Sequence, residues 1–424
     1  MKAYFLSAIF WLASLVMPAT QAKSEGYPFQ DPYYATITAA VLKAHERDKE
    51  VNYRDVSLKM LPARDDVPYY GSTQNKFKLR YWAAKGRAPL IVMITGLGGH
   101  AGSTYYNFLA YHFVKKGYHV LAVPNPLHFS FALAGSTSGF PGVTREDARD
   151  LYATILKGLD KLQRKAGLDY SSVGLVGVSL GALEGAYLSE LDAREKKLNF
   201  QRVLLVNPPV DPLFGIHALD RLAAQGANVS EARKDEIQKA VYQLGFFTLI
   251  AGDITSPKYF DRLEQLLPTT LEERQYLIGS SLQGFLPSLL FTTQQVHDLG
   301  IFKTDVATAD PEPRLAEAKA FSFTDYINKF LLPGLSAQAG KAVTYEDILP
   351  ITGMQGVEAH LRADPRVLLM HNADDFIVSA EQLQWLQRVF GSRMKLYPYG
   401  GHLGNIWYPE SLEAILGAFR DLPR

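Results

Sequence analysis

The stretch that decides the fold is Gly-Leu-Val-Gly-Val-Ser-Leu-Gly-Ala, residues 174–182. The residues before Ser179 form a short apolar run rich in valine, which is typical of a buried parallel strand, and those after it can continue as a helix. Ser179 therefore occupies the sharp turn of a G-x-S-x-G pattern, the position of a nucleophilic serine. Gly177 and Gly181 are expected there because a Cβ at either position would collide with neighbouring backbone. The alternative is a glycine-rich turn without a chemical role.

Composition places the chain among ordinary globular proteins. It has 424 residues, of which 47% are hydrophobic and 12% aromatic, enough for one elaborated domain or two. Its 44 basic and 43 acidic residues leave no excess charge that would attract nucleic acid or an acidic membrane surface, so neither partner is expected. Cysteine is absent, which excludes disulfides, thiolate chemistry and cysteine-based metal sites.

The first 22 residues have the pattern of a signal peptide. Lys2 supplies a positive charge, residues 3–17 form an apolar run, and Thr20 and Ala22 are the small residues of a cleavage site. The alternative is an uncleaved anchor, but the apolar run is shorter than the roughly 20 residues of a membrane-spanning helix. We therefore expect cleavage after Ala22, no stable membrane span afterwards, and a periplasmic or secreted protein.

Strand and helix patterns alternate in two parts of the chain, residues 56–210 and 366–424. Such alternation indicates an α/β fold with a doubly wound, mostly parallel sheet, whose ligands bind at the carboxyl ends of the strands. Residues 23–55 are expected to form an N-terminal arm, and residues 211–365 an inserted helical lid subdomain. Buried strands are predicted at residues 90–95, 118–123, 172–178, 202–207, 366–371 and 394–399, and an antiparallel pair at residues 56–61 and 77–82.

Three local expectations concern segments outside these strands. Residues 35–46 are predicted to form a short helix of the arm, after a proline-rich stretch. Residues 127–143, rich in Gly, Ser and Phe, are predicted to form a loop. Thr144 is expected to begin a long helix, with Asp147 three residues on as its capping-box-like partner.

A base and an acid for the serine follow later strands. A serine hydroxyl needs a base to become a nucleophile, and that base needs an orienting carboxylate. Asp374 and Asp375 come directly after the strand that ends at residue 371, and His402 follows the last strand, between glycines and a leucine. The order Ser, Asp, His along the chain is that of a hydrolase sheet rather than of chymotrypsin-like or subtilisin-like enzymes. Of the ten histidines, His402 alone combines this order with a strand end and flanking glycines.

These residues resemble those of the α/β-hydrolase superfamily over residues 56–210 and 365–424. The stretch His-Asn-Ala-Asp-Asp-Phe-Ile-Val, residues 371–378, is similar to the family's acid loop and assigns the acid position to Asp375. Asp374 is the neighbouring alternative. Asp211 is a third possibility, because some family members place the acid after the preceding strand.

The resemblance also implies an oxyanion hole. One donor would be the backbone N–H of Leu180, the residue after the nucleophile. Thr-Gly-Leu-Gly-Gly, residues 95–99, is similar to the family's His-Gly-x-Gly-Gly loop, in which Leu97 would supply the second N–H. Thr95 departs from the family's histidine, which leaves the bracing of the loop open. A phosphate loop is not indicated, because no Gly-Lys-Ser/Thr follows.

The sequence thus predicts a serine hydrolase that needs no cofactor or metal and cleaves a carboxylic ester through Ser179, His402 and Asp375. Phe and Leu in the insertion suggest an apolar acyl pocket for a small-molecule ester. Peptide cleavage, as in the family's aminopeptidases, and acyl transfer to an alcohol are the alternatives on the same residues. A negative subsite for a free amine would favour the peptidase, but Glu184 cannot be placed from the sequence. A non-catalytic binding protein of this fold is the remaining alternative.

Overall fold

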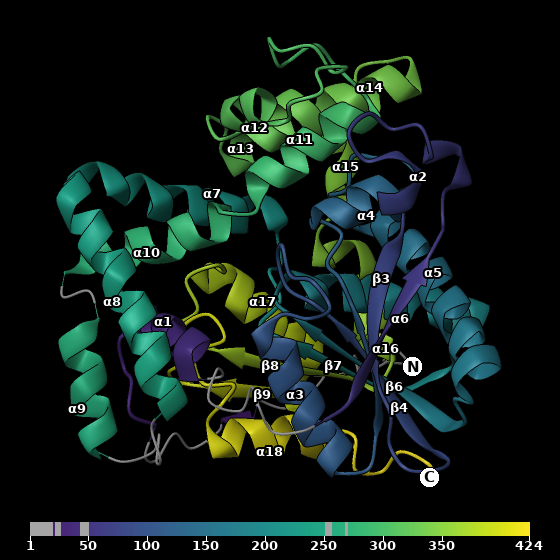
Figure 1. Cartoon of the computed structure of the whole chain (residues 1–424). Coiled ribbons are helices and arrows are strands. Elements are labelled where there is room, and N and C mark those ends of the chain that lie inside the picture. The colour runs from purple at the N-terminus through teal and green to yellow at the C-terminus, as the bar shows by residue number, and fades with distance from the viewer. Residues whose placement is uncertain (1–19, 22–26, 43–50, 251–256, 268–269) are drawn as a thin grey trace, which may run out of the picture.

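A nine-stranded sheet forms the centre of the computed structural model, which describes residues 20–21, 27–42, 51–250, 257–267 and 270–424 (Figure 1). The strand order is β1-β9-β8-β7-β6-β4-β5-β3-β2. Neighbouring strands are parallel except β2 with β3 and β3 with β5. This is the doubly wound, mostly parallel sheet that the sequence predicts. Its strands are β1 (Thr20–Gln21), β2 (Tyr53–Leu58), β3 (Phe77–Trp82), β4 (Ala88–Ile94), β5 (His119–Val123), β6 (Tyr170–Val178), β7 (Phe200–Val206), β8 (Val367–Asn372) and β9 (Met394–Tyr397).

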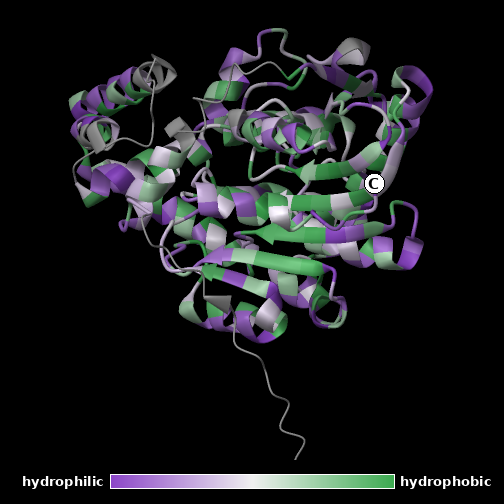
Figure 2. Cartoon of the chain, turned by 90° about the horizontal axis from the view of Figure 1, so that it is seen from below, coloured by the Kyte–Doolittle hydropathy of each residue, from purple (hydrophilic) through white to green (hydrophobic). Residues whose placement is uncertain are grey.

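The central strands are buried on both faces. Every residue of β4 and β5 is buried, as are the last seven residues of β6. Figure 2 shows the corresponding arrows as a largely hydrophobic layer between more polar helices. Because successive residues of a strand point to opposite faces, such strands need a layer of helices on each side.

Two contacts on β6 identify these layers. A Cβ on Gly174 would lie 2.7 Å from Phe419, which follows helix α18 (Pro409–Gly417), whereas the side chain of Leu175 lies beside Gly185 in α6 (Leu180–Glu195). Gly174 and Leu175 point to opposite faces, so α18 and α6 cover opposite sides of the sheet.

The other core helices join these two layers. In α3 (Thr104–Lys115), Phe113 packs with its ring centroid 5.6 Å from that of Phe419, so α3 lies with α18. Helix α5 (Thr144–Ala166) packs against α6. The short α16 (Glu358–Ala363) and α17 (Ala380–Phe390) pack against each other beside β8 and β9.

A helical insertion separates β7 from β8, as the sequence predicts. In Figure 1, α7, α8 and α10 lie at the left and upper left, and α11 to α14 lie at the top. Within the described residues of this insertion we find helices and turns but no strand. The helices are α7 (Pro212–Ala224), α8 (Glu231–Ile250), α9 (Pro257–Leu266), α10 (Leu271–Gln283), α11 (Leu286–Val296), α12 (Glu312–Ala318), α13 (Phe323–Asp325), a π-helical turn (Tyr326–Leu331), α14 (Leu332–Ala339) and α15 (Tyr345–Ile348).

The N-terminal arm begins its helix earlier than the sequence predicts. Helix α1 spans Pro32–Leu42, because the Asp31 carboxylate accepts from the Tyr34 backbone N–H at 2.6 Å and proline fits the first turn of a helix. Pro32 therefore begins the helix instead of preventing it. Residues 43–46 of the predicted helix lie outside the described residues.

The predicted signal peptide lies almost wholly outside the described residues. Its described part is the two-residue strand β1, which pairs with Lys395 and Leu396 of β9. β1 is an edge strand, so the other eight strands pair with one another and not through it. Among the described residues, we find no helix with both the length and the apolar character required to cross a bilayer.

Two further expectations are wrong. Within the predicted loop, the apolar run after His128 forms helix α4 (Phe129–Ala134), capped by the His128 side chain, which accepts from the Ser130 N–H. Asp147 does not cap α5: its carboxylate accepts from the Gly142 N–H at 2.6 Å, and Thr144 donates to the Thr352 carbonyl at 2.8 Å. Thr144 has a partner 208 positions away, and Asp147 bonds the backbone just before the helix, so the two do not form the expected capping box. The short α2 (Gly71–Gln74) completes the edge near β3.

The close packing of α7 on α10 gives a stability prediction. A Cβ on Gly279 of α10 would lie 2.2 Å from the Ala223 backbone nitrogen in α7, so Gly279→Ala must push the helices apart. We expect the free energy of unfolding to fall by about 1–3 kcal/mol, the usual cost of overpacking. Urea unfolding followed by circular dichroism measures the change. Gly417→Ala, where an added Cβ meets nothing closer than 3.6 Å, is the matched control, and an equal loss in both variants would contradict the prediction.

Candidate active site

Ser179 lies on a strained turn at the carboxyl end of β6. Its backbone has φ 54° and ψ −126°, a conformation that residues other than glycine rarely adopt. Its N–H donates to the Val206 carbonyl at 2.8 Å. A Cβ on Gly177 would lie 2.2 Å from the Gly181 oxygen, and one on Gly181 would lie 2.3 Å from the Thr95 oxygen. The reason given for the two glycines is therefore confirmed, and the turn presents the Ser179 hydroxyl to the pocket.

The structure brings together three residues from the ends of β6, β8 and β9. The Ser179 hydroxyl lies 2.8 Å from His402 Nε2, and His402 Nδ1 lies 3.0 Å from Asp375 Oδ2. The acceptor-only carboxylate fixes a proton on Nδ1, which leaves Nε2 free to accept from the hydroxyl. All three residues are buried: Ser179 is 8% exposed, His402 9% and Asp375 4%.

Asp375 is held by more than the histidine. The Asn207 side-chain amide donates to Asp375 Oδ2 at 2.7 Å, and the Ile377 N–H donates to Oδ1 at 3.1 Å. Burial alone would raise the pKa of Asp375, but His402, together with His371 and the Asn207 amide, holds that pKa below its ordinary value. The group is therefore an ionised acceptor at neutral pH. Sequence reasoning missed Asn207, although its position directly after β7 is a signal that could have found it.

The two alternative acids have other partners. Asp374 accepts from the N–H groups of Gly400 and Gly401, at 3.1 and 2.8 Å, and so holds the turn before His402. Burial raises its pKa to about 6. Asp211 caps α7 through the Leu213 N–H and accepts from the Tyr345 hydroxyl at 2.9 Å. Neither carboxylate takes the hydrogen bond from His402 Nδ1.

The loop after β4 is braced by Thr95. Its hydroxyl donates to the Gly99 carbonyl at 2.8 Å, and its own carbonyl accepts from the Asn125 amide at 2.9 Å. The Gly96 N–H donates to the Tyr106 hydroxyl. These bonds supply the bracing that the departure from the family's histidine left open. Leu97 and Leu180 both line the same pocket as Ser179.

Helix α1 supports the loops of both His402 and Asp375. The Thr36 hydroxyl accepts from the His402 N–H at 2.9 Å, and a Cβ on Gly401 would lie 2.0 Å from the Pro32 oxygen. Tyr33 stacks on Phe376, the neighbour of Asp375, with ring centroids 5.1 Å apart. The sequence predicts the arm but offers no signal for these contacts, because the residues that make them are far apart along the chain.

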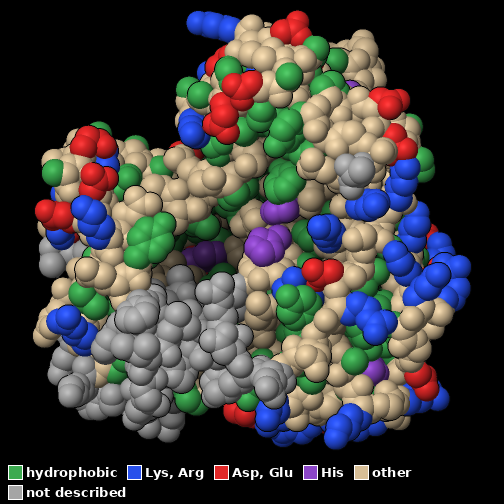
Figure 3. All heavy atoms as spheres, viewed as in Figure 1, with side chains coloured by type: hydrophobic (Ala, Val, Ile, Leu, Met, Phe, Trp, Pro, Cys, Tyr) green, Lys and Arg blue, Asp and Glu red, His purple; other side chains and the backbone are tan. Residues whose placement is uncertain are grey.

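Ser179 lines a largely apolar pocket. Figure 3 shows a hollow on this face of the molecule, with hydrophobic side chains in it and histidine side chains beside it. Helix α7 supplies much of the apolar wall, together with Leu282 of α10 and the loops after β4 and β5. The apolar lining residues include Leu97, Leu127, Leu213, Ile216, Leu219, Leu282 and Ile377.

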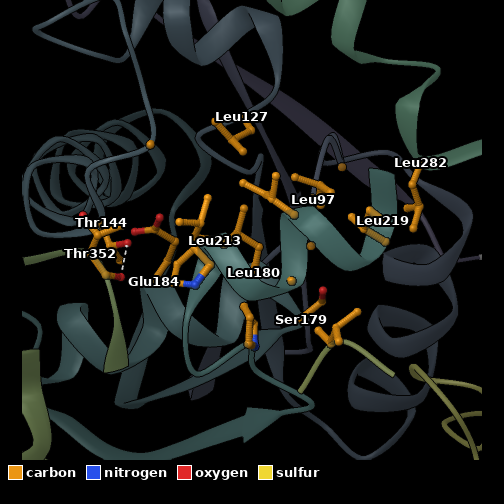
Figure 4. Close-up of a pocket in the computed structure, with 18 of the residues that line it drawn as sticks. Leu97, Leu127, Thr144, Ser179, Leu180, Glu184, Leu213, Leu219, Leu282 and Thr352 are labelled. Atoms are coloured by element: carbon orange, nitrogen blue, oxygen red, sulfur yellow. Dashed lines mark hydrogen bonds between the residues drawn. The ribbon is translucent and has the colours of Figure 1, made fainter. Parts of the chain in front are cut away.

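One end of this pocket is acidic. Asp147 of α5 and Glu184 of α6 line it together with Thr144, Tyr326 and Thr352. Figure 4 shows Glu184 beside Thr144 and Thr352, on the far side of Leu180 and Leu213 from Leu219 and Leu282. Sequence reasoning assigned Asp147 to a helix cap and left Glu184 unplaced. We call this group of five residues the acidic end.

Comparisons with known proteins place the chain only distantly. No family model matches it, and no curated protein matches its sequence. Among solved structures, it is similar to a thioesterase domain from the curacin biosynthetic pathway (14% identity, 87% of this chain and 99% of that one, TM-score 0.38). It is also similar to an esterase from Pyrococcus furiosus (14%, 87% and 91%, TM-score 0.40). A third likeness is to an acylaminoacyl peptidase from Pyrococcus horikoshii, of which this chain covers 42% (13% identity, 88% of this chain, TM-score 0.42).

Likenesses this distant carry no argument about the reaction, so the fold is assigned from the chain's own geometry. The parallel sheet, the turn at Ser179 on its central strand, and the order of Ser179, Asp375 and His402 along the chain are those of the α/β-hydrolase fold.

Proposed function

We propose that the protein is a serine hydrolase that cleaves a carboxylic ester through an acyl-enzyme. The observation that carries this proposal is the continuous hydrogen-bonded chain from Ser179 through His402 to Asp375, in which Ser179 and His402 line a largely apolar pocket. His402 takes the proton of the Ser179 hydroxyl as the oxygen attacks the ester carbonyl carbon. It then returns that proton to the departing alcohol, and water repeats the sequence on the acyl-enzyme.

The developing oxyanion needs fixed donors. The backbone N–H of Leu180 is available because the first N–H groups of a helix have no partner within the helix, and α6 begins at this residue. The N–H of Leu97 is the second donor in this proposal, held by the braced loop that follows β4. Donors positioned in advance stabilise the charge without reorganising, which is the largest contribution in many acyl-transfer enzymes.

The pocket lining favours an acyl group with apolar carbon. Leucine and isoleucine side chains from the insertion and from the core loops surround the path that leads away from Ser179. Burying apolar carbon there contributes about 25 cal/mol for each Å² removed from water, so esters with a longer acyl chain bind more tightly until the chain fills the pocket. We further propose that the protein is exported, as the pattern of the first 22 residues indicates.

The first prediction tests the nucleophile. We expect the protein to hydrolyse p-nitrophenyl esters of increasing chain length faster than aminoacyl anilides, and to be labelled by a fluorophosphonate probe. Ser179→Ala removes the attacking oxygen, so labelling disappears and kcat falls by about 10⁴- to 10⁶-fold. Ser189→Ala, in the same helix outside the pocket, is the control. An unlabelled wild-type protein would sink the proposal.

The second prediction separates the adjacent carboxyls. Asp375→Asn removes the acceptor that holds the Nδ1 proton of His402, so we expect kcat to fall by about 10⁴-fold. Asp374→Asn keeps an acceptor oxygen for the Gly401 N–H, so its loss should be roughly a hundredfold smaller. Steady-state hydrolysis of p-nitrophenyl butyrate measures both losses. Equal losses of kcat in the two variants would contradict the assignment of the acid role to Asp375.

The third prediction concerns processing. When the full chain is produced in a bacterium with a periplasm, we expect the mature protein to begin at Lys23 and to be recovered from the periplasm or the medium. Intact-mass spectrometry of that fraction gives the first residue. A protein that retains Met1 or stays in the cytoplasm would contradict the proposed export.

A further inference from the structure

The acidic end of the pocket holds two buried carboxyl groups, and no lysine or arginine side chain is among the described residues that line the pocket. Asp147 and Glu184 are 3% and 2% exposed and line the same cavity as Ser179. In addition to burial, the negative charge of Asp147 raises the pKa of Glu184. Two more carboxyls on the helix of Asp147, Asp150 and Glu146, raise the pKa of Asp147 in the same way.

The acidic end also lacks hydrogen-bond donors for Glu184. Its three hydroxyl groups each donate to a backbone carbonyl: Thr144 to Thr352 at 2.8 Å, Thr352 to Ile348 at 2.8 Å, and Tyr326 to Pro141. Among the described residues, Glu184 Oε2 is buried without a hydrogen-bond partner. A buried carboxyl oxygen without a donor is costly, so a ligand that fills this end gains most by supplying one.

The position of Glu184 relates this end to the reacting atoms. Leu180 and Glu184 are four residues apart in α6, so they lie on one face of the helix, about 6 Å apart along its axis. Leu180 is a proposed oxyanion donor. An acyl chain that runs from the oxyanion site along α6 therefore brings its far end to Glu184.

We propose that the acidic end binds a primary ammonium group at the far end of the substrate's acyl chain. This inference rests on the proposed ester hydrolysis and specifies its substrate class as an amino-terminated acyl ester. The free amine of an aminopeptidase substrate is on the carbon next to the carbonyl, whereas the ammonium proposed here is at the far end of the acyl chain, so the acidic end differs from the peptidase subsite considered from the sequence. An ammonium supplies three N–H donors and one positive charge, which can reach Glu184 Oε2, Asp147 and a hydroxyl oxygen together. A hydroxyl group supplies one donor and no charge, so it would leave the pair only partly satisfied.

The protonation of the free pair fits this assignment. Burial raises the pKa of Glu184 well above its ordinary value, and the neighbouring Asp147 raises it further. Burial also raises the pKa of Asp147, although the Gly142 N–H opposes the shift. Both shifts favour the protonated form of the pair as long as no cation lies beside it. An ammonium restores the ionised form, so its binding releases that proton to solution.

The first test compares two esters of equal length. Methyl 6-aminohexanoate and methyl heptanoate differ in one terminal group, ammonium against methyl, and acid release in a pH-stat gives kcat/KM for each. We expect the wild type to favour the amino ester at least tenfold. Glu184→Gln should lower that preference at least tenfold. Glu195→Gln, the same change at the exposed end of the same helix, should leave the preference unaltered.

The second test needs neither a variant nor catalysis. Isothermal titration calorimetry compares hexylamine with hexanol as ligands of the wild-type protein at pH 7, in two buffers with different heats of ionisation. We expect hexylamine to bind at least tenfold more tightly than hexanol and to release about one proton for each ligand bound.

The outcomes separate the two proposals. Ester hydrolysis with a preference for heptanoate, and hexanol binding as tightly as hexylamine, would overturn the ammonium site and leave the ester hydrolase standing. Tighter hexylamine binding without proton release would overturn the assignment to the protonated pair. If neither ester is hydrolysed, the proposed function fails, and the calorimetry still decides whether the acidic end binds an ammonium.

Discussion

The hydrogen bond between the Ser179 hydroxyl and His402 Nε2 joins residues that are 223 positions apart in the chain. To form it, the carboxyl ends of β6, β8 and β9 must meet at one edge of the sheet, and the sheet must be in register across β7. The strained backbone of Ser179 depends on the same condition. Its turn is possible because Gly177 and Gly181 let β4, β6 and α6 approach closely.

The rest of the molecule restricts how His402 and Asp375 can move. Asn207 holds one oxygen of Asp375, Asp374 holds the turn before His402, and Thr36 accepts from the His402 backbone. These contacts come from β7, from the acid loop itself and from the N-terminal arm. Reacting groups held by packing and by secondary hydrogen bonds keep their geometry, which is why much of the chain serves a site made of few residues.

The sequence predicts this fold well where strands end. Ser179, Asp375 and His402 each directly follow an apolar run, and parallel strands bring such positions to one edge. The same reasoning fails where a side chain leaves its local partner. Asp147 follows Thr144 at capping-box spacing, yet Thr144 donates to Thr352, 208 positions away, and this tertiary contact outweighs a cap worth about 1 kcal/mol. Thr36 and Tyr33 could not be foreseen, since no periodicity links them to residues near position 400. The proline-rich start of α1 shows the same limit: Asp31 makes a cap that composition alone does not reveal.

The contact of α1 with the His402 loop makes the two ends of the chain interdependent. Thr36 and His402 are 366 positions apart. The acceptor of that bond is therefore synthesised long before its donor. Until the last strand has joined the sheet, the imidazole has neither its carboxylate nor its backbone support, and the serine has no base. Under the proposed function, a chain that is still being made is therefore inactive towards esters. Activity then requires both α1 and the last strand to be in place, although Thr36 is not one of the proposed reacting residues.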